Sequence, residues 1–94
     1  QVLDARLREM SRRLAEAVHS SAEERVCRRV LAFGSAFDGT IRLSQATLAS
    51  LAGTTRPTVN RVLQALARDE TVRLRRARIE VVNPEALAAR VPAL

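Results

Sequence analysis

Residues 53–69, GTTRPTVNRVLQALARD, constrain the fold more than any other stretch of the chain. The glycine breaks a preceding helix, Thr55 or Thr54 is suited to cap the next one, and Pro57 falls in its first turn, where a missing N–H group costs nothing. Four apolar residues then recur at helical spacing: Val59, Val62, Leu63 and Leu66. The stretch therefore predicts a helix over residues 56–69 with one face packed on a core.

On the opposite face of this helix lie Pro57 and four polar residues, Asn60, Arg61, Gln64 and Arg68. Arginine pairs with guanine O6 and N7, whereas asparagine and glutamine suit adenine N6 and N7, and an α-helix fits the major groove of B-DNA. The helix thus presents residue types that read bases. Arg56 lies nearer the apolar edge of the helical wheel, and the wheel alone does not assign it.

The flanking segments predict further helices. Ser21 with Glu24 three residues later forms a capping box before Val26, Val30, Leu31 and Phe33, and Gly34 is expected to end that helix. Ser44 is expected to cap a short helix through Ala52, with Leu48, Leu51 and Ala52 turned inward. Asn83 and Pro84 begin a last short helix.

Alternating segments predict strands. Residues 37–43 read as a turn and a short strand, and residues 72–74 and 79–81 alternate around Arg75, Arg76, Ala77 and Arg78 as a β-hairpin. The order helix, glycine turn, helix and hairpin is that of a winged helix-turn-helix. We therefore expect a mainly α fold with a small β-hairpin, consisting of a three-helix core and a wing.

The excess of positive over negative charge lies in one part of the chain. The net charge is +6 over 94 residues, and residues 40–79 hold eight arginines against Asp69 and Glu70, so they carry the whole excess. Such a localised charge points to a polyanion partner, although a solvated basic face is the plain alternative. Each wing arginine that meets a phosphate should make DNA affinity more sensitive to salt.

The first eighteen residues carry a heptad-like seam of Leu3, Leu7, Met10 and Leu14. We favour a homodimer seam over packing of this helix on its own domain. The expected domains are the end of a dimerisation helix at 1–18 and a winged helix-turn-helix at 19–94. Because the chain begins at Gln1 in a helical pattern, we expect it to be a fragment of a longer protein.

The sequence of residues 43–87 resembles the DNA-binding domain of the Crp/Fnr family of bacterial transcription regulators, most specifically in GTTRPTVNRVL. Residues 21–34 and 1–18 are similar to that family's connecting helix and to the end of its dimerisation helix. The resemblance implies a cytoplasmic, dimeric regulator that binds a pseudo-palindromic site on double-stranded DNA, with RNA polymerase as a further partner. It implies no cofactor in this segment, and any effector ligand would belong to an absent sensor domain.

The resemblance also implies roles for residues. Arg56 corresponds to the first base-reading residue and Arg61 to a second arginine in the groove or on phosphate, beside Asn60 and Gln64. Positions that match backbone contacts are Ser44, Gln45, Thr55 and Thr58, and the wing adds Arg73, Arg75, Arg76 and Arg78. Two departures matter: Pro57 replaces a glutamate that reads cytosine, and the wing turn lacks glycine, so we expect a wider loop.

Other classes of protein fit less well. An enzyme would have to use His19, Cys27, the acidic residues or the Ser/Thr hydroxyls, which show no nucleophile–base pattern. One Cys with one His does not make a zinc site. No apolar run approaches the length of a membrane span. The remaining alternatives are a winged-helix protein that binds DNA without sequence preference, and a protein-interaction module that uses residues 1–18.

Overall fold

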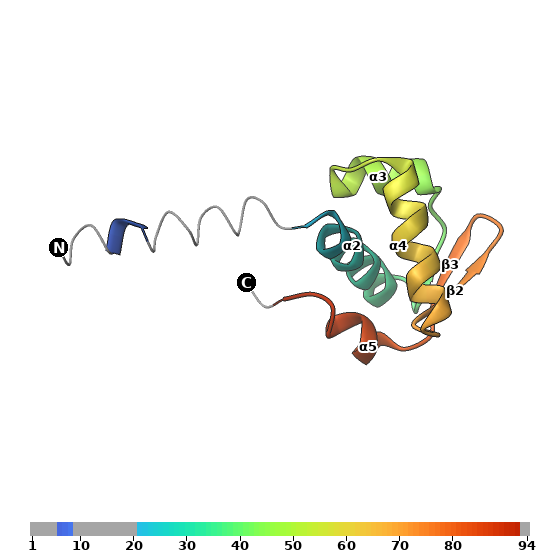
Figure 1. The fold of residues 1–94 in the computed structure, drawn as a ribbon. Helices are drawn as coiled ribbons and strands as arrows, with labels where there is room; N and C mark the ends of the chain where they lie inside the picture. Colours follow the sequence, from blue (N-terminus) through green and yellow to red (C-terminus); the bar gives the residue numbers. More distant parts are fainter. Residues whose placement is uncertain (1–5, 9–20, 93–94) are drawn as a thin grey trace.

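The computed structural model describes residues 6–8 and 21–92. The elements in residues 21–92 are, in order, α2 (Ala22–Ala36), β1 (Thr40–Ile41), α3 (Gln45–Ala52), α4 (Arg56–Arg68), β2 (Val72–Arg75), β3 (Arg78–Val81) and α5 (Pro84–Ala88). The helices α2, α3 and α4 pack on one another, and the β2–β3 hairpin projects beside α4 (Figure 1). This confirms the predicted three-helix core with a wing, and α4 ends one residue earlier than expected.

Each predicted helix start is closed by the side chain that the sequence indicated. Ser21 Oγ accepts a hydrogen bond from the Glu24 N–H at 3.1 Å, and Asn83 Oδ1 accepts from the Ala86 N–H at 3.1 Å. Ser44 and Thr55 cap α3 and α4 in the same way. These contacts are three residues apart in sequence, which is why local pattern alone was enough to predict them.

The expected end of the first helix at Gly34 is wrong. Helix α2 continues through Gly34 to Ala36, and Phe37 is its C-cap. Gly34 is buried against β3, where an added Cβ would lie 2.8 Å from Val81 Cγ2. The glycine is therefore needed for the close approach of helix and sheet, and not for termination.

The sheet contains one strand more than the predicted hairpin. The strand order is β1-β3-β2, with all pairs antiparallel. The short strand expected in residues 37–43 is present as β1, and it pairs Thr40 with Glu80 and Ile41 with Ile79. Its pairing with β3 was not predicted because it joins segments about forty residues apart.

The wing turn is tighter than the sequence suggested. Arg75 pairs directly with Arg78, so only Arg76 and Ala77 connect the strands. Ala77 adopts φ = 56°, a left-handed conformation that usually favours glycine. The expectation of a wider loop is therefore wrong, because alanine accepts a modest backbone strain there.

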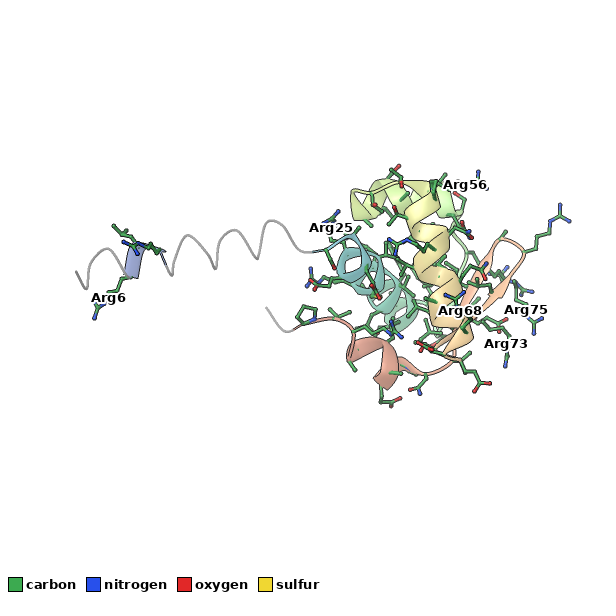
Figure 2. The ribbon with its side chains drawn as sticks, in the orientation of Figure 1. Arg6, Arg25, Arg56, Arg68, Arg73 and Arg75 are labelled. Atoms are coloured by element: carbon green, nitrogen blue, oxygen red, sulfur yellow. The ribbon has the colours of Figure 1, made fainter. Side chains whose placement is uncertain are left out.

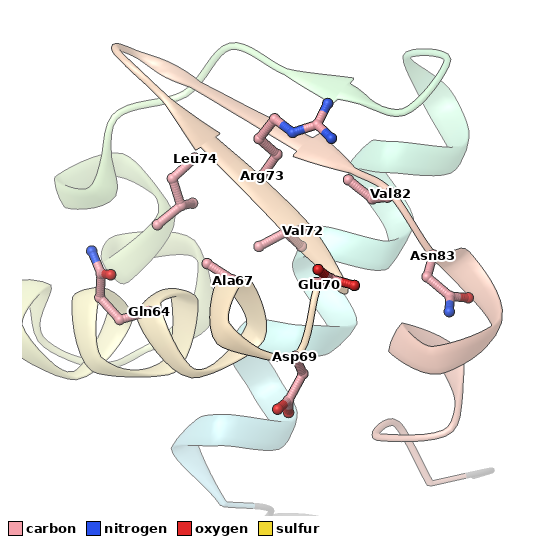
Figure 3. A pocket seen from close by; sticks show the side chains of 9 residues that line it. All are labelled: Gln64, Ala67, Asp69, Glu70, Val72, Arg73, Leu74, Val82 and Asn83. Atoms are coloured by element: carbon pink, nitrogen blue, oxygen red, sulfur yellow. The ribbon is translucent and has the colours of Figure 1, made fainter.

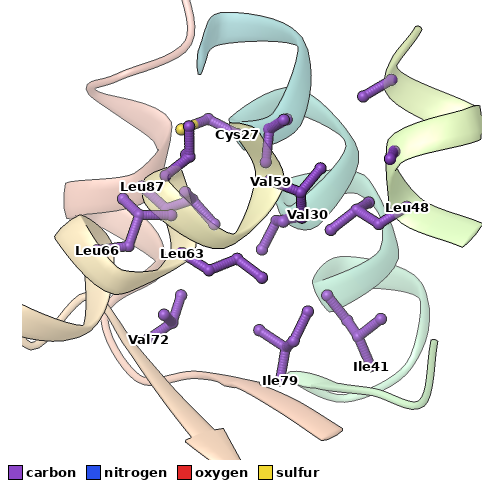
Figure 4. Packing of buried hydrophobic residues seen from close by; sticks show 14 residues of the cluster. Cys27, Val30, Ile41, Leu48, Val59, Leu63, Leu66, Val72, Ile79 and Leu87 are labelled. Carbon is purple, nitrogen blue, oxygen red and sulfur yellow. The ribbon is translucent and has the colours of Figure 1, made fainter. Parts of the chain in front are cut away.

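The core is aliphatic and is shared by every element (Figure 4). All four residues of the predicted stripe on α4 are buried in it, together with Val26 and Val30 of α2 and Ile79 of β3. In α3, Leu48 and Ala52 are buried as expected, whereas Leu51 is 40% exposed and Ala49 takes the inward position. The core thus fixes which face of α4 remains outside.

Of the predicted seam, only Leu7 is among the described residues. It lies on a helical turn of residues 6–8 and is 55% exposed. Leu3, Met10 and Leu14 lie outside the described residues, so the dimer seam stays a prediction.

Candidate nucleic-acid interface

The outer face of α4 is polar and open to solvent along its whole length. The exposed residues are Arg56, Pro57, Asn60, Arg61, Gln64 and Arg68. Figure 2 shows Arg56 at one end of the helix and Arg68 at the other, with Arg73 and Arg75 on the neighbouring hairpin. The four predicted base-reading side chains, Arg56, Asn60, Arg61 and Gln64, are all exposed on α4, and this helix packs beside β2 of the wing.

The turn between α3 and α4 is held by an arginine that sequence reasoning did not identify. Gly53 ends α3 at φ = 65°, a left-handed C-cap. Arg25, on α2, donates from Nε to the Ala52 carbonyl at 2.8 Å and from Nη2 to the Gly53 carbonyl at 3.2 Å. A cation at carbonyls of a helix C-terminus is favoured by the helix dipole. Arg25 therefore ties the end of α3 and the turn before α4 to α2.

The hydroxyl groups at the helix starts bond to one another. Thr55 Oγ1 donates to Thr58 Oγ1 at 3.0 Å, and Ser44 Oγ donates to Thr47 Oγ1 at 2.9 Å. A hydroxyl has a single hydrogen to donate. Each pair of hydroxyls therefore uses one of its two hydrogens within the chain and has the other left to donate.

The starts of α3 and α4 differ in the number of backbone N–H groups that remain free. In α4, Pro57 has no N–H and the Thr58 N–H is bound by Thr55, which leaves the N–H of Arg56 in the first three positions. In α3, Ser44 binds the Thr47 N–H and leaves two N–H groups. Anions bind at such groups, so α3 offers a better phosphate site at its start than α4 does.

Gln45, which was expected to contact the DNA backbone, is bound to another residue of the predicted site. Its Nε2 donates to Asn60 Oδ1 at 3.3 Å, across the gap between the start of α3 and the second turn of α4. The structure thus connects a residue expected on the DNA backbone with a residue expected to read a base.

The wing arginines are partly neutralised. Strand alternation places Arg73, Arg75, Arg78 and Glu80 on the outer face of the sheet, since Ile79 and Leu74 face the core. Glu80 lies 3.6 Å from Arg73 and 4.0 Å from Arg75. Arg76 and Arg78 form no ion pair with the described part of the chain. The four arginines are therefore not equivalent toward a phosphate.

A groove of about 870 Å³ lies between α4 and β2 (Figure 3). Gln64 stands on its α4 wall and Arg73 on its β2 side, while Asp69 and Glu70 occupy the end where α4 turns into β2. Two carboxylates repel phosphate, so they mark the limit of the basic surface at this end of α4. Arg90 binds Asp69 and also Glu23, at 3.2 Å, and so ties the segment after α5 to α2 and to the end of α4.

The comparisons with known proteins agree with this geometry. A family model described as "Crp-like helix-turn-helix domain" matches residues 24–90. The chain belongs to the Crp-like helix-turn-helix family. It is 37% identical over 60 residues to "HTH-type transcriptional regulator Cmr" of Mycobacterium tuberculosis (strain CDC 1551 / Oshkosh), which covers 64% of this chain and 25% of that protein.

Solved structures of Crp/Fnr regulators are similar in fold. The catabolite activator protein of Thermus thermophilus is 36% identical, with a TM-score of 0.69 over 95% of this chain and 42% of that one. FixK2 of Bradyrhizobium japonicum is 22% identical, with a TM-score of 0.74 over 98% of this chain and 49% of that one. The chain therefore spans less than half the length of these relatives, and the family is one of DNA-binding transcription regulators and not a class of enzymes.

One of the groups considered for catalysis, Cys27, lies in the core. Cys27 is fully buried, and burial, with a smaller effect of the Glu23 carboxylate, raises the pKa of its thiol to about 11. A protonated, buried thiol is a poor nucleophile. His19 lies outside the described residues. Across residues 6–8 and 21–92, His, Cys, Asp and Glu side chains form no cluster of three that suits a metal ion, and no helix is long and apolar enough to cross a membrane.

Proposed function

We propose that this chain is the sequence-specific DNA-binding output domain of a bacterial Crp/Fnr-type transcription regulator. Helix α4 enters the major groove, and Arg56, Asn60, Arg61 and Gln64 meet base edges. The observation that carries the proposal is the exposed polar face of α4, whose opposite face is locked into the core. Arginine, asparagine and glutamine on an exposed helix face are the residue types that pair with base edges in the major groove.

The hydrogen bonds within the chain indicate which donors remain for the DNA backbone. The hydroxyl pairs Thr55–Thr58 and Ser44–Thr47 each have one hydrogen left to donate, and the start of α3 offers N–H groups. On the wing, Arg76 and Arg78 are the arginines without an ion pair in the described chain, and we assign them to the phosphates ahead of Arg73 and Arg75.

We further propose that the regulator acts in the cytoplasm as a homodimer on a pseudo-palindromic site, with the seam at residues 1–18 joining two copies. A second exposed feature supports a protein partner such as RNA polymerase. Phe37 is 61% exposed and stacks on Phe33 with ring centroids 6.3 Å apart, beside a mainly apolar groove of about 640 Å³. Exposed apolar patches of this kind mark interaction sites.

Selection of bound duplexes from a random 30-base-pair pool, at two salt concentrations, tests the base-reading proposal. We expect enrichment of an inverted repeat by the wild type, and its loss in the Asn60→Ala, Arg61→Ala double variant. The control is Arg29→Ala, which removes a positive charge from the exposed side of α2 and should leave the enriched motif unchanged. Salt-sensitive binding without enrichment would instead indicate a winged helix that holds only the backbone. No binding at all would favour the protein-interaction alternative.

A further inference from the structure

The contact between Gln45 and Asn60 bears on how the side-chain amide of Asn60 is oriented on α4. Gln45 is the first residue of α3 and is half-buried, whereas Asn60 is exposed on α4. The 3.3 Å hydrogen bond runs from the amide nitrogen of Gln45 to the amide oxygen of Asn60. The two helices are joined by the turn at Gly53 and share the core, which brings the two side chains together.

The direction of this hydrogen bond matters chemically. An asparagine side chain has an acceptor end, its carbonyl oxygen, and a donor end, its NH₂ group, and a half-turn about the last side-chain bond exchanges them. Donation by Gln45 holds the oxygen of Asn60 toward α3. The NH₂ group of Asn60 then lies on the opposite side of the amide and keeps both of its hydrogens.

We propose that Gln45 is a positioning residue that makes Asn60 a hydrogen-bond donor toward the base it meets. The inference rests on the proposed function, since it requires α4 to lie in the major groove. A donor at this position selects a base with an acceptor there: guanine N7 or O6, adenine N7, or thymine O4. It disfavours cytosine, whose major-groove edge presents a donating amino group.

The role differs from that of a simple phosphate contact. A phosphate contact contributes equally to every sequence, whereas a positioning role changes preference at a single base pair. The two roles therefore predict different patterns when Gln45 is changed.

The test uses the full 94-residue chain and the duplex enriched in selection, with each base pair replaced in turn. Affinities are measured by fluorescence anisotropy for the wild type, Gln45→Met, Asn60→Ala and the double variant. Methionine keeps the length of the side chain and removes the donor. We expect Gln45→Met to lower discrimination about two- to tenfold, the range of one neutral hydrogen bond, at the same base pair that Asn60→Ala affects. The double variant should match Asn60→Ala alone.

A second variant should reverse the base preference at this base pair, which a merely structural role of Gln45 would not do. In Gln45→Glu the new carboxylate accepts only, so it binds the NH₂ group of Asn60 and turns the oxygen outward. Preference at that base pair should then shift toward cytosine, whose amino group donates, while the added negative charge weakens all sequences alike. Ser50→Ala, on the exposed surface of α3, is the matched control and should change neither quantity.

Different results would contradict the positioning role of Gln45 and the base-reading role of α4. Equal weakening of all duplexes by Gln45→Met, or additive effects in the double variant, would overturn the positioning role and return Gln45 to the backbone. A wild type that discriminates at no base pair would refute base reading itself, before any variant is compared. Circular dichroism melting of each variant shows whether the fold is retained.

Discussion

Cys27 is a residue whose environment has a measurable consequence. Its thiol is buried between α2 and the rest of the core, and its pKa is raised from 9.0 to about 11. The unfolded chain therefore ionises first as the pH rises. The stability that comes from the neutral buried thiol is complete below pH 9 and is lost between pH 9 and about 11. We expect the free energy of unfolding to fall by roughly 2 kcal/mol over that range.

The chain suits this measurement because it contains no lysine and no tyrosine. Arginine stays protonated, so Cys27 is the one side chain with an ordinary pKa in this range. Urea unfolding, followed by circular dichroism from pH 8 to 11, measures the effect. Cys27→Ala lowers stability at every pH through its cavity, but its profile should be flat. If the free energy of unfolding fell equally with pH in the wild type and in Cys27→Ala, the loss of stability would have to come from a group other than Cys27.

At the level of elements, the contact between α2 and β3 depends on Gly34. In Gly34→Ala the new Cβ would lie 2.8 Å from Val81 Cγ2, and overpacking of this kind costs about 1–3 kcal/mol. Alanine recovers up to about 1 kcal/mol of helix propensity. We expect a net loss of about 1 kcal/mol, seen as a melting temperature lower by about 4–8 °C.

Val81→Ala provides the matched partner for that change. It removes the clashing methyl group, so Gly34→Ala should be neutral or stabilising in its presence. A double-mutant cycle by thermal melting gives the coupling between the two sites. If Gly34→Ala raised the melting temperature on its own, Val81 would have to rotate away freely, and the close approach would not constrain the fold.

In the wing, the carboxylate of Glu80 offsets part of the positive charge of the arginines. Glu80 pairs with Arg73 across the strands and also lies near Arg75. In Glu80→Gln both arginines are released and a repelling charge is removed. We expect tighter binding to random-sequence DNA and a plot of log K against log salt that is steeper by about 0.9 for one added phosphate contact.

Glu85→Gln is the control, because Glu85 is exposed on α5 and the substitution removes the same charge. Titrations at four or more salt concentrations distinguish the two variants. Similar effects of both would mean that only net charge matters. An unchanged slope with Glu80→Gln would place Arg73 and Arg75 away from the phosphates.

For the whole molecule, the sequence predicted what short-range patterns determine. The cap of α4 by Thr55 and the burial of Val59 and Leu63 follow from spacing within one helix. The role of Gly34, the pairing of β1 with β3 and the contact of Arg25 with Ala52 join distant segments, and no local pattern encodes them. The site was predicted as a set of residues, but its internal hydrogen bonds, which decide what each residue can donate, required the structure.

The last prediction concerns two copies of the chain. If the seam at residues 1–18 joins a dimer, the two α4 helices should meet half-sites one helical turn apart, about 34 Å or 10 base pairs. Moving the half-sites from 10 to 15 base pairs turns them to opposite sides of the duplex, so affinity should fall to that of a single half-site. Anisotropy titrations on the two duplexes measure this. Leu7→Arg, at an exposed seam position, should give single-half-site affinity at both spacings. Equal, tight binding by the wild type at both spacings would show that the copies bind independently.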